Sequence, residues 1–279
     1  MTPRITVGIP VHNDPRYVEE AVRSIQEREE LEIVVIDDAS DDPQTLEVLA
    51  RMPSLGARLV RREASGGLGA ARNAVLAAAT TPYLFNLDSD DLAVPGRLAE
   101  MADRLDADPT VAVCYGDWEE FGANESHRFV PSWIDPFRLA WISEYPPSAM
   151  WRCDAIRAVG GWPESPNTRA IYEDWRLWAV LAREQVHSAY LGRGVVSYRR
   201  RLHGESQLSL VRRRHRAAYR DIRASHPELF RNLRRNRRLT DLSLKRQLLY
   251  PLFYGPRPRF GFEPKVRFWL ERHGVKTSL

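Results

Sequence analysis

Short apolar runs alternate with amphipathic stretches through the first 115 residues, and no other feature of the sequence constrains the fold as strongly. The apolar runs have the length and composition of buried strands, and helical patterns separate them. Such alternation is typical of βα units on a mostly parallel sheet, so we predict an α/β fold with helices flanking that sheet. The predicted strands are 5–9, 32–36, 57–61, 82–87 and 111–115, and the predicted helices are 16–27, a segment from about 44, and 67–79.

Beyond residue 115 the pattern is less regular. Strand signals occur at 148–152 and 194–198, and 172–184 is amphipathic and helical. Arg-rich helices are expected from residue 207 onward, with breaks at Pro227 and across 251–264, because proline disrupts the helical hydrogen-bond pattern. We therefore expect a helical extension at the C-terminus.

Acidic loops follow two of the predicted strands. Asp37 and Asp38 end the second strand, and Asp88, Asp90 and Asp91 follow the fourth. Open α/β sheets bind ligands at the carboxyl ends of their strands, so these loops should converge on one crevice.

The Asp88-Ser89-Asp90 segment has two readings. Mg²⁺ prefers oxygen ligands and takes one or two carboxylates together with phosphate oxygens, which this loop can supply. Alternatively, the aspartates form a solvated turn and cap the helix that follows. An EF-hand is disfavoured because Ala93 stands where that loop needs glycine. For Asp38, too, an Asx-turn competes with hydrogen bonding to a nucleotide.

Glycines open the helix that contains Arg72. The segment 67–73 resembles a dinucleotide fingerprint but lacks its third glycine, which Arg72 replaces. Exposed backbone N–H groups and Arg72 could still bind an anion, whereas the plainer alternative is a surface ion pair.

Two adjacent acids, Glu173 and Asp174, begin the helix predicted at 172–184. They either compensate the helix dipole or supply a general base facing a substrate cavity. His203 lies in the basic loop after the last predicted strand, where it either contacts phosphate or metal or is simply solvated.

Six segments, in this order and spacing, resemble the family 2 glycosyltransferases, which are inverting enzymes of the glycosyltransferase A-type fold. The resemblance covers roughly residues 4–210. The matching segments are VGIPVHN (7–13), VVIDDASDD (34–42), GGLGAARNAV (66–75), YLFNLDSDDLAVPGRL (83–98), VGGWPE (159–164) with YEDWRLW (172–178), and YRRRLHGESQLS (198–209).

The resemblance implies a donor site at the carboxyl ends of the first strands. Asp38 would bind the nucleobase, while Pro10 and His12 would lie near the base or ribose. Arg72 and Asp88 would contact the ribose, sugar or phosphates. The remaining donor-site residue, Asp90, would bind a divalent cation, Mg²⁺ or Mn²⁺, that bridges the diphosphate.

The same resemblance implies an acceptor site and a single displacement. Asp174 would be the catalytic base, with Glu173 and Trp162 shaping the acceptor site and His203 near the phosphates or the metal. Such a reaction needs one base and no carboxylate nucleophile. We expect the helix dipole to keep Asp174 ionised. UDP is the favoured nucleotide, on its frequency in the family. Two departures from the family pattern, Trp162-Pro163 and the basic run 199–201, leave the acceptor open.

Charge is divided unevenly along the chain. Residues 193–279 hold 23 of the 41 Lys and Arg and 6 of the 37 Asp and Glu, so this part carries +17 and the rest −13. We expect a catalytic domain at 1–210, with a nucleotide-sugar-binding half at 1–117 and an acceptor half at 118–210. A basic helical extension at 211–279 would follow, which either packs on the domain or touches anionic lipid.

The expected partners are a nucleotide-diphosphate sugar and a carbohydrate or lipid-linked acceptor, and no nucleic acid. Two cysteines, no 18-residue apolar run and no leader signal favour the cytoplasm, with peripheral contact at the inner face of the membrane. Two other functions stay open. One is a catalytically degenerate protein that only binds a nucleotide sugar. The other is a nucleic-acid-binding protein, which would leave the acidic strand-end loops unexplained.

Overall fold

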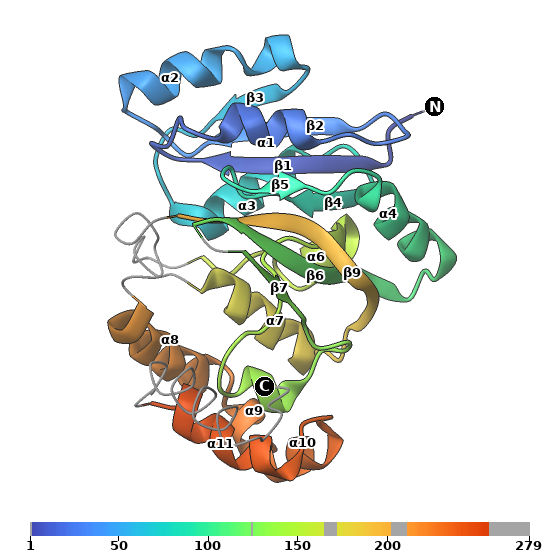
Figure 1. Cartoon of the computed structure of the whole chain (residues 1–279), viewed down its shortest axis with the longest axis vertical. Coiled ribbons are helices and arrows are strands. Elements are labelled where there is room, and N and C mark those ends of the chain that lie inside the picture. The colour runs from blue at the N-terminus through green and yellow to red at the C-terminus, as the bar shows by residue number, and fades with distance from the viewer. Residues whose placement is uncertain (1, 124, 165–171, 202–210, 257–279) are drawn as a thin grey trace.

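One sheet forms the centre of the molecule in the computed structural model, which describes residues 2–123, 125–164, 172–201 and 211–256 (Figure 1). Within these residues the sheet has nine strands, and eight of them follow the order β3-β2-β1-β4-β8-β6-β9-β5, while β7 pairs with β6. The strands are β1 Ile5–Val11, β2 Glu32–Asp37, β3 Arg58–Arg61, β4 Tyr83–Asn86, β5 Leu92–Ala93, β6 Val111–Gly122, β7 Ser126–Arg128, β8 Met150–Arg152 and β9 His187–Arg200.

The first four strands are parallel and form the upper half of the view in Figure 1. Their carboxyl ends therefore lie at one edge of the sheet, as the alternating pattern predicts. Pro10 is accommodated in the central strand β1 because the pairing with β4 ends at Gly8 and Asn86, so its missing N–H is not needed there.

The second half of the sheet is mixed. β8 runs antiparallel to both β4 and β6, and β5 runs antiparallel to β9, while β6 and β9 pair in parallel over a long stretch. The prediction of an α/β fold with flanking helices is confirmed, and the sheet is parallel in its first half only. The long pairing of β6 with β9 carries the end of β9 to the acidic loop that follows β4.

Helices cover both faces of the sheet. One core joins the strands to α1, α2 and α4, and the other joins them to α3, α5, α6 and α7. The helices are α1 Val18–Ser24, α2 Pro43–Ala50, the 3₁₀ helix η1 Met52–Leu55, α3 Gly67–Ala78, α4 Arg97–Ala107, α5 Pro136–Leu139, α6 Cys153–Ala158, α7 Glu173–Arg183, α8 Val211–Ser225, α9 Pro227–Arg231, α10 Leu233–Leu239 and α11 Leu244–Tyr254.

Helix α3 approaches β1 very closely. A Cβ atom on Gly8 would lie 2.1 Å from Cγ1 of Val75, so this crossing requires a residue without a side chain. Val75 is fully buried and lies one turn after Arg72 on α3. The glycine in β1 therefore helps to set the depth at which α3 presents Arg72.

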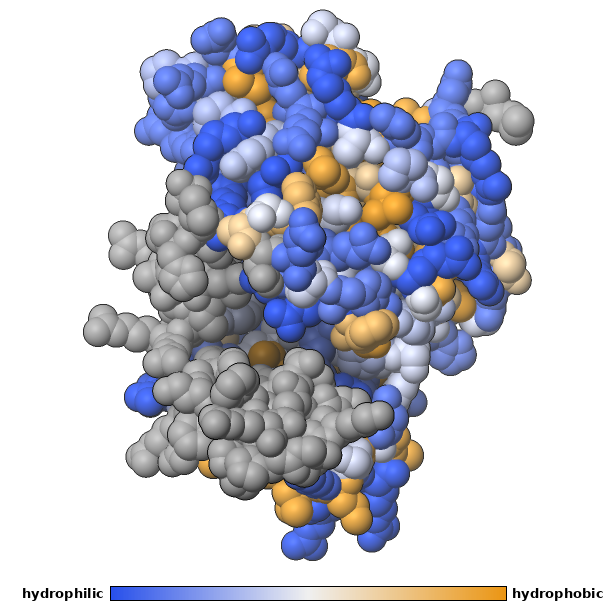
Figure 2. Space-filling model, viewed as in Figure 1, coloured by the Kyte–Doolittle hydropathy of each residue, from blue (hydrophilic) through white to orange (hydrophobic). Residues whose placement is uncertain are grey.

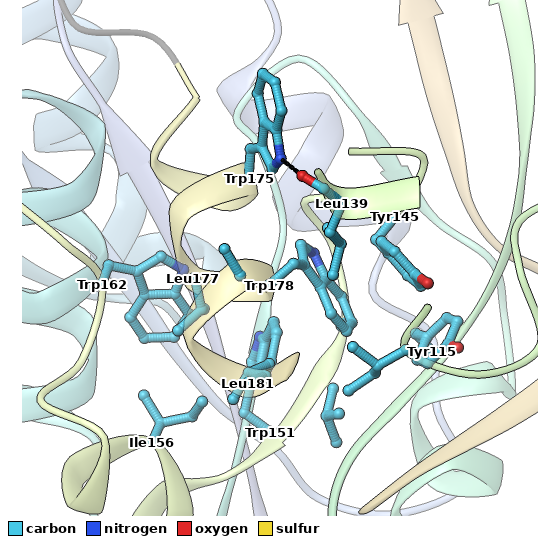
Figure 3. Packing of buried hydrophobic residues seen from close by; sticks show 14 of the residues in the cluster. Tyr115, Leu139, Tyr145, Trp151, Ile156, Trp162, Trp175, Leu177, Trp178 and Leu181 are labelled. Atoms are coloured by element: carbon cyan, nitrogen blue, oxygen red, sulfur yellow. Dashed lines mark hydrogen bonds between the residues drawn. The ribbon is translucent and has the colours of Figure 1, made fainter. Parts of the chain in front are cut away.

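Aromatic side chains fill the core beneath α7 (Figure 3). Trp178 packs against Tyr145, with ring centroids 4.6 Å apart, and against Trp151 at 5.3 Å. The indole N–H of Trp175 donates to the carbonyl of Leu139 on α5, at 2.8 Å. Burial of several large aromatic rings is a major source of stability, and here it fixes the start of α7.

The C-terminal helices pack against the segments around α5 and α7 and share their core. Trp141 stacks on Tyr219 of α8, and Trp175 stacks on His215 of the same helix. Arg138 of α5 donates to Asp241, 2.6 Å away, between α10 and α11. This packing does not test the predicted domain boundaries. The division into 1–117, 118–210 and 211–279 therefore stays a prediction.

Two expectations for the C-terminal helices have different outcomes. The expected break at Pro227 is present, because α8 ends at Ser225 and α9 begins with Pro227. The helix expected to break across 251–264 ends within that range, because α11 continues through Pro251 and stops at Tyr254, and residues 257–264 lie outside the described part of the chain. Burial of Tyr250 and Phe253 against the rest of the molecule stabilises the last turns of α11 despite the proline.

Candidate active site

The Asp-x-Asp loop leaves β4 at the edge of the sheet where the parallel strands end. Asp88 and Asp90 have partly exposed side chains, whereas Asp91 is buried. The Asp91 carboxylate accepts the backbone N–H of Arg199, at 2.8 Å. Arg199 also donates from Nε to the carbonyl oxygen of Asp90. The loop is therefore fastened to the end of β9, and two of its three carboxylates stay partly exposed.

Arg72 connects the Asp-x-Asp loop with the start of α7. Its side chain is fully buried; Nη2 lies 2.8 Å from Oδ1 of Asp88, and Nη1 lies 2.6 Å from Oε1 of Glu173. Burial opposes the charge on Arg72, but the attraction of Asp88 and Glu173 is larger and raises the pKa of the guanidinium above its ordinary value. Arg72 is thus a permanent cation that holds two acidic segments together.

The start of α7 is held in an unusual backbone conformation. Tyr172, which precedes Glu173, has φ of 87°, in the left-handed region that residues with a side chain rarely adopt. Such conformations cost about 1–3 kcal/mol and cluster at functional sites. With Trp175 anchored in the core, this turn places Glu173 and Asp174 beside Arg72.

Asp174 does not have the protonation behaviour that the helix dipole predicts. Burial disfavours the charged form, the neighbouring carboxylate of Glu173 adds repulsion, and together they outweigh Arg72 and raise the pKa of Asp174 to about 7. The expectation of a carboxylate kept ionised by the dipole is therefore corrected. A base whose pKa lies near the working pH is well suited to remove a proton from a hydroxyl group.

Asp38 already has several partners within the chain. Its two carboxylate oxygens accept hydrogen bonds from Ser65 Oγ and from the backbone N–H groups of Gly66 and Gly67, and it also pairs with Arg62. These contacts fasten the end of β2 to the first turn of α3. Both readings of Asp38 stay open, because a nucleobase would have to replace one of these partners.

The remaining predicted donor residues lie at the end of β1. Pro10 is buried in the strand, and His12 is exposed just beyond it. The Nδ1 atom of His12 lies 2.9 Å from the carbonyl oxygen of Asp38, so the ends of β1 and β2 are joined there. The structure thus brings Pro10, His12 and Asp38 together at one edge of the sheet.

Trp162 and His203 are the two remaining residues that the sequence predicts for the site. Trp162 is a core residue, only 2% exposed, and its ring packs edge-to-face on Trp151. Trp162 could therefore shape an acceptor site only from within the core, and its role there stays a prediction. His203 lies outside the described residues.

The acidic residues at this edge can be compared with the ligands that a divalent cation needs. Within the described part of the chain, no three His, Cys, Asp or Glu side chains form a ready-made metal site. Mg²⁺ and similar ions need fewer protein ligands when a phosphate group completes their shell. The partly exposed carboxylate of Asp90, with Asp88 nearby, meets this smaller requirement. The donor set therefore fits a cation that binds together with a diphosphate.

Sequence reasoning did not assign roles to several charged residues at this edge. Arg199 and Arg201 contact the Asp-x-Asp loop, and Arg62 contacts Asp38. The unusually basic run 199–201 was the available signal, but its contacts depend on the pairing of β9 with β6, which brings distant segments together.

The fold and the acidic strand-end site define a glycosyltransferase of the A-type fold. A sequence model described as glycosyl transferase family 2 matches residues 6–155, which is more than half of the chain. The chain therefore belongs to glycosyl transferase family 2, as the six motifs implied.

Among related sequences, the succinoglycan biosynthesis protein ExoO of Rhizobium meliloti is 36% identical over 107 residues. That alignment covers 38% of this chain and 30% of ExoO. Alignments with two further relatives cover 15% and 35% of their lengths, so the chain spans no more than about a third of these proteins.

Two solved structures show the same fold at low sequence identity. One is residues 1–349 of S. aureus TarS in complex with UDP-GlcNAc, with a TM-score of 0.59, 18% identity, and coverage of 96% of this chain and 77% of that one. The other is the mannosyltransferase PcManGT of Pyrobaculum calidifontis in complex with GDP-Man and Mn²⁺, with a TM-score of 0.59, 20% identity, and coverage of 100% and 77%.

Proposed function

We propose that this protein transfers a sugar from a nucleotide-diphosphate sugar to an acceptor hydroxyl group, with inversion at the anomeric carbon. The observation that carries this proposal is the position of Arg72 between Asp88 and Glu173. This contact brings the Asp-x-Asp loop close to the start of α7, where burial and Glu173 raise the pKa of Asp174 to about 7.

Asp174 would act as the general base. It accepts the proton of the acceptor hydroxyl while that oxygen attacks the anomeric carbon from the side opposite the diphosphate, which leaves with the bonding electron pair. A single displacement of this kind inverts the configuration and needs one carboxylate. Arg72 and Glu173 would hold Asp174 in position, since they fix the first turn of α7 against the loop after β4.

The donor would lie across the ends of β1, β2 and β4, near Pro10, His12 and Asp38 for the nucleoside and near Arg72, Asp88 and Asp90 for the sugar and phosphates. Asp90 would hold the Mg²⁺ or Mn²⁺ ion, and Asp88 would lie beside it. When bound, such an ion stabilises the charge that develops on the leaving diphosphate. His203, as a phosphate or metal contact, remains part of this proposal.

UDP is the nucleotide we propose first. TarS, which shares the fold, is described in complex with UDP-GlcNAc, whereas PcManGT is described with GDP-Man and Mn²⁺. Both complexes support a nucleotide-diphosphate sugar as the donor class, and the second supports a divalent cation. The name of ExoO supports an acceptor that belongs to a growing polysaccharide.

A catalytically degenerate protein that only binds a nucleotide sugar is the second candidate. The raised pKa of Asp174 favours the catalytic proposal over this one, because a carboxyl group with a pKa near neutrality is suited to proton removal.

The proposal is tested by nucleotide release from a panel of UDP-, GDP- and dTDP-sugars with and without Mn²⁺. We expect turnover with one donor class, dependent on the cation, and a loss of about 100-fold or more in Asp90→Asn. Asp154→Asn, which removes an exposed acid on α6, is the matched control. Binding of the donor without any turnover would favour the degenerate alternative.

A lipid-linked acceptor at the inner face of the membrane is favoured by one surface. Leu244, Leu248 and Leu252 of α11 are 71%, 65% and 46% exposed and recur every four residues, so they form one outward row. Figure 2 shows hydrophobic side chains beside hydrophilic ones along the lower edge, where α10 and α11 lie. The exposed arginines of α10 are close in sequence, and such a combination suits an anionic lipid surface.

Vesicle co-sedimentation tests this membrane contact. Wild-type protein should bind vesicles that contain phosphatidylglycerol, and added salt should weaken the binding. Serine at Leu244 and Leu248 together should reduce it at least severalfold, whereas Phe129→Ser, at a residue 81% exposed on another surface, should not. Equal binding to neutral vesicles, or no effect of the leucine changes, would contradict it. No helix among the described residues has the length and apolar character needed to cross a membrane.

A further inference from the structure

Arg201 directly follows β9 and contacts two acidic residues of the donor edge. Its Nη1 atom lies 2.6 Å from Oδ2 of Asp14, and its Nη2 atom lies 2.7 Å from Oδ2 of Asp90. The side chain is 12% exposed, and its guanidinium carbon lies 5.3 Å from the centre of the Tyr17 ring. Arg201 is thus enclosed by groups that favour a positive charge.

This contact is part of a built arrangement. Arg199 holds the end of β9 against the Asp-x-Asp loop through Asp90 and Asp91. Side chains along a strand alternate between its two faces, so Arg201 emerges on the same side as Arg199. Arg200 faces the opposite side and pairs with Glu120 instead.

The charges at this position balance one another. Nη2 of Arg201 lies 2.7 Å from Oδ2 of Asp90, and a positive charge at this distance favours the ionised form of a carboxyl group. The guanidinium therefore stabilises the carboxylate that our proposed function assigns to a divalent cation. Two cations that depend on one carboxylate repel each other, so strong binding of one weakens binding of the other.

We propose that Arg201 is an internal counter-ion of the donor site and competes with the divalent cation for Asp90. The cation alone would then bind weakly. It would bind well only together with a diphosphate, which supplies further ligands and compensates for the displaced guanidinium. Cation and donor would therefore enter as a coupled pair. This inference rests on the proposed function only in the assignment of Asp90.

The test measures Mn²⁺ binding by titration calorimetry without nucleotide or acceptor. Arg201→Met, which keeps the length of the apolar stem, should bind Mn²⁺ about tenfold more tightly than wild type, within the range usual for coupled sites. Arg200→Met is the matched control, because it removes the same charge at the next position without a contact to Asp90. We expect a change of no more than about twofold in this control.

A second measurement follows Arg201 itself. The Nε–H of Arg201 is buried and has no hydrogen-bond partner among the described residues. Its side-chain NMR signal is assigned by its loss in Arg201→Met. Addition of Mg²⁺ with UDP should shift this signal, and the shift should be absent in Asp90→Asn.

The inference would be overturned if Arg201→Met and Arg200→Met bound Mn²⁺ with equal affinity, or if neither bound it. An Arg201 signal that does not move at saturating Mg²⁺ and UDP would also overturn it. Failure of the proposed function would instead show as missing turnover with every donor, which neither measurement depends on.

Discussion

The guanidinium of Arg72 lies 2.6 Å from the carboxylate of Glu173, a residue 101 positions further along the chain. The two residues come from elements far apart in the sequence, and they meet because α3 and α7 pack beside each other on one face of the sheet. The Arg72 guanidinium joins the start of α7 to α3 and, through Asp88, to the loop after β4. The site therefore contains one buried cation, Arg72, that is shared by two acids, Asp88 and Glu173.

Arg72→Met should lower both stability and turnover. It leaves Asp88 and Glu173 without their cation in a buried position, and breaking a buried pair in this way typically costs about 3 kcal/mol or more. Urea unfolding measures the loss. Adding Glu173→Gln to Arg72→Met should recover part of it, because the uncompensated charge disappears.

Arg183→Met is the control for this change, since Arg183 pairs with Glu184 at the surface and should contribute about 0.5 kcal/mol or less. A loss in Arg72→Met as small as that in the control would show that the bridge does not hold the two segments together.

Gly8→Ala should destabilise the protein through the crossing of β1 and α3. The added methyl group overlaps Val75, and overpacking of a core costs about 1–3 kcal/mol. Val75→Ala in the same chain should restore part of the loss, as measured by thermal unfolding.

Gly194→Ala, where a Cβ atom would make only ordinary contacts at 3.5 Å, is the matched control. If both glycine variants unfold alike, the close approach of α3 to β1 is not what requires glycine at position 8.

Turnover should rise with pH as Asp174 ionises. The pKa of Asp174 is raised to about 7 by burial and by Glu173, so the basic form is the minor one at lower pH. Below about pH 6 the rate should fall roughly tenfold per pH unit, and above about pH 8 it should level off. Initial rates across buffers of constant ionic strength measure this profile. A rate independent of pH below about 7 would mean that another group is the base.

The C-terminal helices should unfold together with the rest of the chain. Trp141 and Trp175 of the acceptor half stack on Tyr219 and His215 of α8, so separating α8 would expose apolar surface on both sides. Urea unfolding followed by circular dichroism and by tryptophan fluorescence should give coincident transitions.

Two separate transitions would instead support an independent extension at 211–279. A chain that ends at residue 210 should aggregate, or unfold at a lower urea concentration than the full chain. The reason is that removal of the C-terminal helices exposes the apolar surfaces of α5 and α7.

The fold of the first four strands and their helices could be predicted from local pattern, because strand and helix periodicities are visible within a few residues. The carboxyl ends of parallel strands then lie at one edge of the sheet. Asp38, Asp88 and Asp90 could be assigned to that edge on the same ground. The antiparallel insertion of β8 could not, since three residues carry too little pattern to reveal a strand direction.

Residues whose roles depend on distant contacts were missed or misread. Arg201 is one of many arginines in its segment, and the pairing of β9 with β5 and β6 brings it to Asp90. The motif of Trp162 predicts a part in shaping the acceptor site, but it does not reveal that the ring packs in the core against Trp151. The pKa of Asp174 likewise depends on burial and on Glu173 more than on its place in a helix.

The central claim is that Asp174 is the base of a sugar transfer, and one comparison tests it directly. Donor affinity and the rate of nucleotide release are measured for wild type and Asp174→Asn with the same nucleotide sugar. We predict that affinity changes by no more than about threefold, since the base faces the acceptor, while the rate falls about 100- to 10,000-fold. Unchanged turnover in Asp174→Asn would contradict the account.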